Sequence, residues 1–271
     1  MGAIATTGNK GKGIRSDCFV TLELTDRDGI ALEIESKVAV MYGESIRRDA
    51  LQILEHLGVA NARVKIEDTG AVPLVMAARL EAAVKKVMNT GASWLPTAQD
   101  SNRATTARDR NRFSRLYLPG NSPSLMINAG IHKPDGIILD LEDAVAPDRK
   151  DEARFLVRNA LLGIDFYGAE RMVRINQGER GLEDLAYVIP YHVNLILLPK
   201  CEHAAQVLAV SERIDQLLSA SGQPGPVWIM PIIESAMGVI NAFAIASASP
   251  AVVALAIGLE DYTADLGTRR T

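Results

Sequence analysis

The feature that most constrains the fold is an alternation of short apolar segments with longer amphipathic ones, which begins near residue 114. Six apolar runs of strand length occur at residues 116–118, 136–141, 172–175, 193–198, 227–233 and 252–257. Apolar residues recur at helical spacing between several of these runs, at 150–162, 204–218 and 237–248. Strands that are apolar throughout and separated by helices are typical of a parallel sheet covered on its outer face. The pattern predicts an α/β fold, either a doubly wound sheet or a barrel.

The chain changes character near residue 100, which predicts two domains and a connector. Residues 1–92 read as a small α+β domain. Its period-two strands at 19–24 and 30–34 flank a turn at 25–29 and predict a hairpin, and a helix at 46–57, a strand at 64–66 and a helix at 74–88 follow. Residues 93–112 are polar and arginine-rich, which predicts a solvated linker, with phosphate docking as the alternative. Residues 113–271 form the α/β region.

Charged side chains follow five of the six apolar runs. Because the carboxyl ends of parallel strands meet at one edge, we expect these side chains to lie together. Several carboxylates in one place are costly unless a cation compensates them, and one or two carboxylates with substrate oxygens are the usual setting for magnesium. No glycine-rich phosphate fingerprint follows the first run, which weighs against a dinucleotide-binding domain. The residues concerned are Asp140, Glu142 and Asp143, then Arg174, then Lys200, then Glu234, and finally Glu260 and Asp261.

Each of these residues also has a purely structural interpretation. A carboxylate that leaves a buried strand is rare without a partner, which favours a metal ligand over a salt bridge for the acids after the fifth and sixth runs. The alternatives are an internal salt bridge for Arg174, Glu234 and Asp261, a cap on the following helix for Glu142 and Asp143, and a solvated strand end for Lys200.

Composition excludes several classes of protein. The net charge is −4 and the pI is near 5.7, so there is no electrostatic footprint for nucleic acid. No apolar run reaches the ~18–20 residues that span a membrane. The only two cysteines, Cys18 and Cys201, match no metal or disulfide spacing. We therefore expect reduced thiols in a cytoplasmic protein.

Residues 114–271 resemble the citrate lyase beta subunits of the HpcH/HpaI aldolase and citrate lyase family. The resemblance implies an incomplete TIM (β/α)8-type barrel and a magnesium-dependent carbon–carbon lyase that cleaves a citryl-type acyl thioester to oxaloacetate and an acetyl thioester. It implies that Arg174 and Glu234 bind substrate and that Glu234 and Asp261 hold Mg2+. We assign proton transfer, or the orientation of metal-bound water, to Glu142 and Asp143. The matching motifs are Ser114–Gly120, Asp140–Pro147 with Lys150 and Arg154, Val173–Asn176, Leu198–Lys200, Ile233–Gly238 and Gly258–Tyr262.

Residues 13–90 resemble the citrate lyase gamma subunit, a small acyl carrier protein. In that family a serine shortly before an aspartate carries a phosphoribosyl-dephospho-CoA arm. Here the arm-bearing position falls on Arg15, which cannot accept the link, and the nearest serine is Ser16. The resemblance therefore implies either an arm on Ser16 or a free CoA thioester as substrate. It also implies a citrate lyase alpha-type subunit as a partner, and we expect a homo-oligomer. The motifs are Ser16–Cys18, Tyr42-Gly43, Leu57–Val59, Asp68–Ala71 and Ala78–Ala82.

Length is the main departure from the family. Complete (β/α)8 barrels take about 250 residues, and this chain has 158 after residue 113, with six strands. We expect a fragment or a truncated barrel whose sheet exposes two edges that a partner covers. Two alternatives to the citryl lyase stay open. One is a malyl-CoA-type lyase or a thioesterase acting on free CoA thioesters, and the other is a non-catalytic carrier or assembly module.

Overall fold

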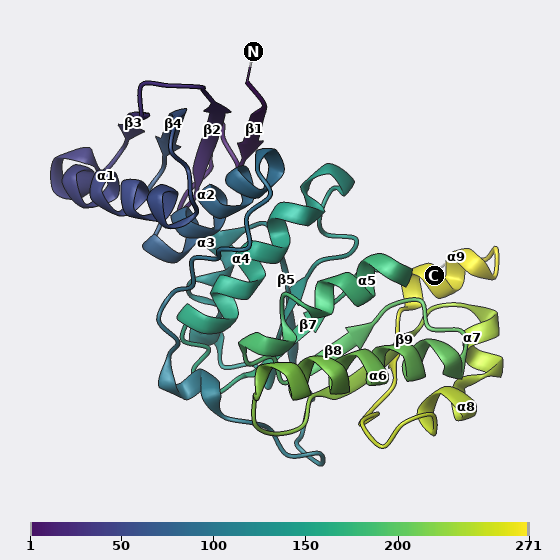
Figure 1. Ribbon diagram of the computed structural model, residues 1–271. Coiled ribbons are helices and arrows are strands. Elements are labelled where there is room, and N and C mark those ends of the chain that lie inside the picture. The colour runs from purple at the N-terminus through teal and green to yellow at the C-terminus, as the bar shows by residue number, and fades with distance from the viewer. Residues whose placement is uncertain (1, 270–271) are drawn as a thin grey trace. The chain divides into compact units, whose positions relative to one another are not determined.

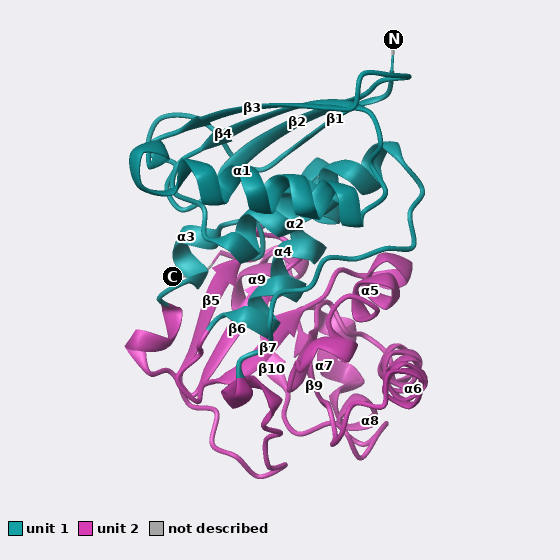
Figure 2. Cartoon of the chain, turned by 60° about the vertical axis from the view of Figure 1, so that its left-hand side comes forward, with its two compact units in different colours: residues 1–99, 120–128, 145–164 teal, residues 100–119, 129–144, 165–271 magenta. Residues whose placement is uncertain are grey.

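The computed structural model describes residues 2–269. The chain forms two compact units, coloured separately in Figure 2. Unit 1 comprises residues 1–99, 120–128 and 145–164, and unit 2 comprises residues 100–119, 129–144 and 165–271. The sequence-based domain limits at 92 and 113 stay a prediction, because these units are defined by contacts and interrupt the second region twice.

Unit 1 contains a four-stranded sheet in the order β1-β2-β4-β3. The predicted hairpin is wrong, since β2 and β3 are not neighbours. β4 lies between them, antiparallel to β2 and parallel to β3. The turn after β2 is held by β4 instead, because Asn61 accepts from Gly29 N through its side chain and from Thr25 N through its carbonyl. The strands are β1 (Ile4–Thr7), which the pattern did not predict, β2 (Cys18–Leu24), β3 (Ile30–Ser36) and β4 (Ala62–Asp68).

Two helices, α1 (Ala39–His56) and α2 (Pro73–Val87), cover one face of this sheet (Figure 1). They pack on the alternate side chains of β2 and β4, such as Leu22 and Ile66, which are fully buried. The other face of α2 packs against α4 (Lys150–Gly163) (Figure 2). Because α2 is covered on two sides, every residue from 75 to 84 is buried, including Arg79 and Glu81.

Unit 2 is built on six parallel strands that lie in the order of the chain, from β5 to β10. A doubly wound sheet reverses its order at a switch point, whereas a barrel does not. The predicted incomplete barrel is therefore confirmed, with β5 and β10 as the edges among residues 2–269. The strands are β5 (Arg115–Pro119), β6 (Gly136–Asp140), β7 (Glu170–Arg174), β8 (Leu195–Leu198), β9 (Trp228–Ile233) and β10 (Ala256–Ile257).

Alternate side chains of these strands form an apolar core on the inner face of the sheet. It contains Ile138, Met172, Leu195, Leu197, Met230 and Ile232, all nearly or fully buried. Polar side chains on the same face begin one step further along the strands, at Asp140 and Arg174. The apolar layer therefore lies directly beneath the polar side chains at the strand ends.

Helices of 5 to 18 residues follow several strands of unit 2. The helix predicted at 237–248 is two helices, α7 and α8, which meet at Asn241. The Asn241 side chain donates to the distant carbonyl of Glu202 (2.8 Å), which fixes the junction of the two helices to the loop after β8. The helices are α5 (Gly178–Leu185), α6 (Ala204–Ser221), α7 (Ala236–Ile240), α8 (Ala242–Ala246) and α9 (Leu259–Asp265), and unit 1 adds α3 (Pro123–Met126). The 3₁₀ turns are η1 (Asp100–Arg103), η2 (Ala129–His132), η3 (Pro147–Arg149) and η4 (Ile189–Tyr191).

Residues 100–112 of the segment predicted as a solvated linker are anchored in unit 2. Arg112 is buried and pairs with the buried Glu170 at the start of β7, with Nε 2.7 Å from Oε2. Thr106 Oγ1 donates to the other oxygen of the same carboxylate (2.6 Å). The prediction of a solvated arginine was wrong here because the buried carboxylate at the start of β7 requires a cation and donors.

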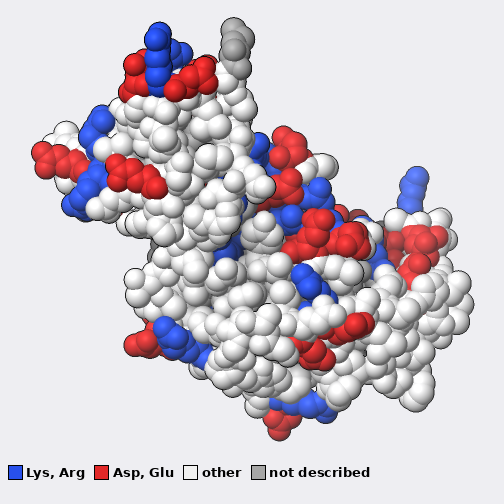
Figure 3. Space-filling model, viewed as in Figure 1, with Lys and Arg blue, Asp and Glu red and all other residues white. Residues whose placement is uncertain are grey.

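On the face drawn in Figure 3, acidic and basic side chains lie interleaved, without a large field of one sign. Within residues 2–269, no helix combines the length and the apolar character that a membrane crossing requires.

Candidate active site

The ends of β6 and β7 bring an arginine and an aspartate into register. Asp140 and Arg174 are paired residues of the two parallel strands. Arg174 donates from Nε to Oδ1 (2.7 Å) and from Nη2 to Oδ2 (2.6 Å) of Asp140. Asp140 also accepts from the backbone N–H of Glu142 and Ala144. The carboxylate of Asp140 therefore fixes both the guanidinium and the loop that follows β6.

The internal salt bridge considered for Arg174 is present, but it does not use all of its donors. Nη1 lies 2.9 Å from Oε2 of Glu142 and 3.8 Å from Oδ2 of Asp143. A guanidinium has five N–H groups, and the two bonds to Asp140 use one on Nε and one on Nη2, while Nη1 faces the acids of the loop after β6. The guanidinium also lies 5.5 Å from the ring centre of Tyr117 on β5.

Glu142 and Asp143 lie in the loop after β6 and face these cations. Gln177 Nε2 donates to Glu142 Oε1 (2.8 Å). Neither acid caps α4, whose N-terminus has no side-chain cap, so the capping alternative is wrong. Burial raises the pKa of Glu142, although Gln177 and Arg174 act in the opposite direction. Glu142 therefore holds a proton to a higher pH than an ordinary glutamate.

Lys200, directly after β8, lies among the acids and is not a solvated strand end. Its backbone has a left-handed φ of 47°. The backbone N–H donates to Oε2 of Glu234 (2.9 Å). Its Nζ lies 3.3 Å from Oδ2 of Asp261, 3.6 Å from Oε1 of Glu142 and 3.7 Å from Oδ2 of Asp143. One ammonium thus touches three carboxylates, which is the environment of a cation site.

Glu234 and Asp261 come from consecutive strand ends, after β9 and in the first turn of α9. Lys200 links them, since its backbone binds Glu234 and its ammonium binds Asp261. Burial raises the pKa of Glu234, and the carboxylates of Glu142 and Asp261 add to the effect. The Glu234 side chain lies against Gly258, where a Cβ would come within 2.3 Å of Oε1. Gly258 therefore makes room for this carboxylate.

The donor set fits a hard divalent cation. Five carboxylates face two cationic side chains, which leaves an excess of negative charge. Within residues 2–269, no three His, Cys, Asp or Glu side chains form a ready metal cluster. Magnesium does not require one, because it is commonly held by one or two carboxylates together with water and substrate oxygens. Glu234 and Asp261 are the pair that could supply these.

Ser16 belongs to unit 1, in the turn before β2. Its backbone has φ 56°, a left-handed conformation that is uncommon outside glycine. Its N–H donates to the carbonyl of Thr69, and the next residue, Asp17, is buried. Attachment of an arm at Ser16 stays a prediction.

Sequence reasoning missed the roles of Asp140 and Tyr117. Asp140 was recognised as a strand end, but not as the partner of Arg174. The register of β6 and β7 supplies that signal, because each residue is the last of its strand. Tyr117 gave no signal, since an aromatic side chain in a short apolar run reads as core. Partial burial of its ring raises the pKa of the Tyr117 hydroxyl, Asp140 acts in the same direction, and Arg174 acts in the opposite one.

Comparison with known protein families gives two matches along the chain. Residues 114–271 match the family described as HpcH/HpaI aldolase/citrate lyase. Residues 7–87 match the carrier-protein family described as malonate decarboxylase delta subunit (MdcD).

Individual relatives match the second region. The citrate lyase subunit beta of Leuconostoc mesenteroides subsp. cremoris is 39% identical over 169 residues, which cover 60% of this chain and 55% of that protein. The L-malyl-CoA/beta-methylmalyl-CoA lyase of Cereibacter sphaeroides is 35% identical over 162 residues, which cover 58% of this chain and 51% of that protein. The solved citrate lyase beta subunit of M. tuberculosis complexed with oxaloacetate and magnesium is 28% identical, with a TM-score of 0.47 over 60% of this chain and 65% of that chain. The chain spans about half the length of the curated relatives it matches.

Proposed function

Because the chain belongs to the HpcH/HpaI aldolase/citrate lyase family, we propose that it is a magnesium-dependent carbon–carbon lyase acting on an acyl thioester. The substrate is a citryl-type thioester, and the products are oxaloacetate and an acetyl thioester. The observation that carries the proposal is the gathering of Glu234, Asp261 and Arg174 at one edge of the barrel sheet. A citryl thioester carries two free carboxylates and a hydroxyl, which a cation and a guanidinium at such a place can bind.

Glu234 and Asp261 are the proposed magnesium ligands. The surplus of carboxylates supports this assignment, as does the citrate lyase beta subunit whose structure contains magnesium and oxaloacetate. When bound, the metal would supply Lewis-acid stabilisation of negative charge on substrate oxygens. Lys200, whose Nζ lies 3.3 Å from Asp261, would hold the carboxylates together before the metal enters.

Arg174 is the proposed clamp for a substrate carboxylate. A guanidinium carries five N–H groups in a planar fork and can form paired hydrogen bonds to a carboxylate. Asp140 acts as a positioning residue, because it holds the guanidinium at two points. The scissile bond is thereby oriented relative to the acids that surround it.

Proton transfer is assigned to Glu142 and Asp143. Asp143 takes the proton of the substrate hydroxyl, whose oxygen becomes the new carbonyl as the carbon–carbon bond breaks. The bonding electrons pass into the thioester enolate, and its carbon receives a proton to give the acetyl thioester. Glu142 is assigned as the donor, because its carboxyl lies at the same strand edge beside Arg174 and Lys200, and burial shifts its pKa upward.

A malyl-type thioester is the second candidate substrate, and the 35% identity to the L-malyl-CoA/beta-methylmalyl-CoA lyase of Cereibacter sphaeroides favours it. Thioester hydrolysis at the same site is the remaining catalytic alternative. The thioester is carried either on an arm at Ser16 or by free CoA, and Arg15 at the arm-bearing position favours free CoA. An alpha-type partner subunit and a homo-oligomer belong to the proposal as well.

The test is turnover of citryl-CoA, malyl-CoA and acetyl-CoA with and without Mg2+. We expect oxaloacetate from citryl-CoA only with the metal, and loss of turnover in Glu234→Gln. Glu212→Gln, on the exposed face of α6, is the matched control. Glyoxylate from malyl-CoA would select the second candidate, and free CoA without an oxo acid would select hydrolysis. A folded chain that turns over none of the three and does not bind Mg2+ would be a non-catalytic module.

A further inference from the structure

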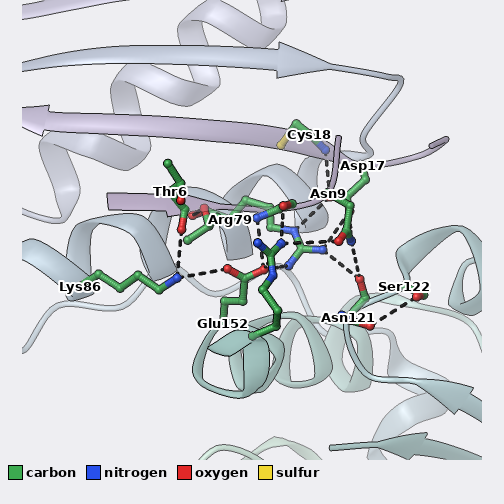
Figure 4. A network of polar contacts seen from close by, with 12 residues as sticks. Thr6, Asn9, Asp17, Cys18, Arg79, Lys86, Asn121, Ser122 and Glu152 are labelled. Carbon is green, nitrogen blue, oxygen red and sulfur yellow. Dashed lines mark hydrogen bonds and ion pairs between the residues drawn. The ribbon is translucent and has the colours of Figure 1, made fainter. Parts of the chain in front are cut away.

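An arginine with no exposed surface lies at the centre of a charge network in unit 1. Arg79, on α2, donates from Nε and Nη2 to the two carboxylate oxygens of Asp17 (3.0 and 2.9 Å). Its Nη1 lies 3.1 Å from Oε1 of Glu152 on α4. Figure 4 shows Arg79 between these two acids. Asp17 belongs to the carrier-like region, whereas Glu152 belongs to the region that matches the lyase family.

Glu152 is fully buried and satisfied from several sides. It accepts from the backbone N–H of Gly8 (3.2 Å), and Lys86 Nζ lies 3.2 Å from its Oε2. Arg149 Nη2 lies 2.7 Å from Oε1. Counting Arg79, three cations surround this one carboxylate, and two of them come from residues 1–99. Without these partners Glu152 would be an isolated buried charge.

A second buried ion pair joins the same two helices, and here the cation is on α4 and the anion on α2. Arg158 on α4 donates from Nη1 and Nη2 to the two oxygens of Glu81 on α2 (3.0 and 2.7 Å). Beside it, Asn159 Nδ2 donates to the carbonyl of Leu74 (3.0 Å). Helix α2 thus presents a cation and then an anion, and α4 presents an anion and then a cation. The two charge patterns are complementary.

We infer that helix α4 is the docking surface for the carrier-like domain, and that this domain is held on it as a fixed part of the fold. A carrier that swung away would break the Arg79–Glu152 and Glu81–Arg158 pairs, and all four side chains are buried. Arg79 would keep only Asp17 of its two acids, and Glu152 would lose Arg79 and Lys86 of its three cations. Asp17, directly after Ser16, is tied into the same network, so the position next to the candidate arm site is immobile as well. The inference goes beyond the proposed lyase and does not depend on it.

The experiment cleaves the full-length protein at one peptide bond and asks whether the two pieces stay associated. A protease site inserted between Thr90 and Gly91, where a side chain at Gly91 would meet no atom within 4 Å, is cut after purification. We expect residues 1–90 to co-elute with the remainder in size-exclusion chromatography at micromolar concentration. Glu152→Gln should weaken their association at least about 100-fold, because breaking one partner of a buried ion pair costs roughly that much. Asp151→Asn, next in the chain and 63% exposed, is the matched control and should stay associated.

Circular dichroism of each uncut variant separates loss of docking from failure to fold. If Glu152→Gln is unfolded before cleavage, Lys86→Met replaces it, since Lys86 reaches the same carboxylate from a partly exposed position. That variant should weaken association about tenfold. Separation of the unsubstituted pieces at micromolar concentration would overturn the inference, and so would equal effects of the test variant and Asp151→Asn.

Discussion

Asp140 and Arg174 stand opposite each other on neighbouring parallel strands and are joined by two hydrogen bonds of 2.7 and 2.6 Å. Asp140 also accepts from two backbone N–H groups of the loop that carries Glu142 and Asp143. A single carboxylate therefore sets the orientation of the guanidinium and the course of the acidic loop. Disturbing it should affect the geometry of the whole site while leaving the barrel sheet intact.

Asp140→Asn tests this relationship. The amide keeps the shape of the carboxylate but presents an NH2 group to a guanidinium that can only donate. We expect kcat/KM for the cleaved thioester to fall by about 100-fold, which corresponds to the loss of one or two charge-assisted hydrogen bonds. Asp148→Asn, exposed after the same loop, should leave kcat/KM within twofold. Wild-type kinetics in a folded Asp140→Asn protein would show that Arg174 does not need this partner.

Arg174→Lys tests the substrate clamp. Lysine keeps the charge but cannot bind Asp140 at two points and a substrate carboxylate at two more. We expect turnover of the citryl or malyl thioester to fall by at least about 100-fold. The control is Arg213→Lys on α6, far along the chain from the strand ends. Unchanged turnover would remove Arg174 from the mechanism.

Gly258→Ala tests whether Glu234 is a metal ligand. Gly258 has φ −94°, which any residue can adopt, so the added methyl acts by crowding Glu234 and not by straining the backbone. We expect Mg2+ affinity measured by calorimetry to fall about tenfold or more, because the displaced carboxylate cannot reach the ion. Gly91→Ala, where a Cβ meets nothing within 4 Å, should bind Mg2+ like the wild type. Equal affinities in the two variants would exclude Glu234 from the site.

The barrel part of the fold could be predicted because its signal is local. Six apolar runs mark the six strands, and charged residues follow five of them, so the order of the strands and the end that carries the polar residues can both be predicted from the chain. The pairing of β2 with β4 could not be predicted in this way. Alternation of apolar and polar residues identifies a strand but does not show which strand pairs with it. The turn after β2 is typical of a hairpin, but its N–H groups at Thr25 and Gly29 bind Asn61, just before β4.

The charge network of unit 1 could not be predicted from the sequence, for a different reason. In the sequence, Arg79, Glu81, Glu152 and Arg158 are ordinary helix residues, and most such charges are solvated. They become important only because α2 is covered on two faces, which no periodicity of α2 alone reveals. Five of the six residues named for the site from the sequence lie together in unit 2. Asp140 and Lys200 could be predicted as strand ends, but their side-chain partners could not, because those depend on the register and packing of the strands.

Acid unfolding of Glu81→Gln tests the buried pair between α2 and α4. Burial by itself would raise the pKa of Glu81, but hydrogen bonds from Arg158 and from the backbone of Trp94 outweigh it and hold the pKa below its usual range. A carboxyl whose pKa is lowered by folding adds stability that is complete above its unfolded pKa and is lost as the pH falls through its folded pKa.

The free energy of unfolding of Glu81→Gln should therefore lie about 3 kcal/mol below that of the wild type at pH 7. The gap should narrow as the pH drops below the roughly 4.3 of an unfolded glutamate, since the wild type then loses the same charge. Urea denaturation at pH 7, 5 and 3 measures both curves. Glu55→Gln, exposed on α1, should show a small and constant gap. A gap for Glu81→Gln that does not change with pH would mean that Glu81 stabilises the fold by its shape and not by its charge.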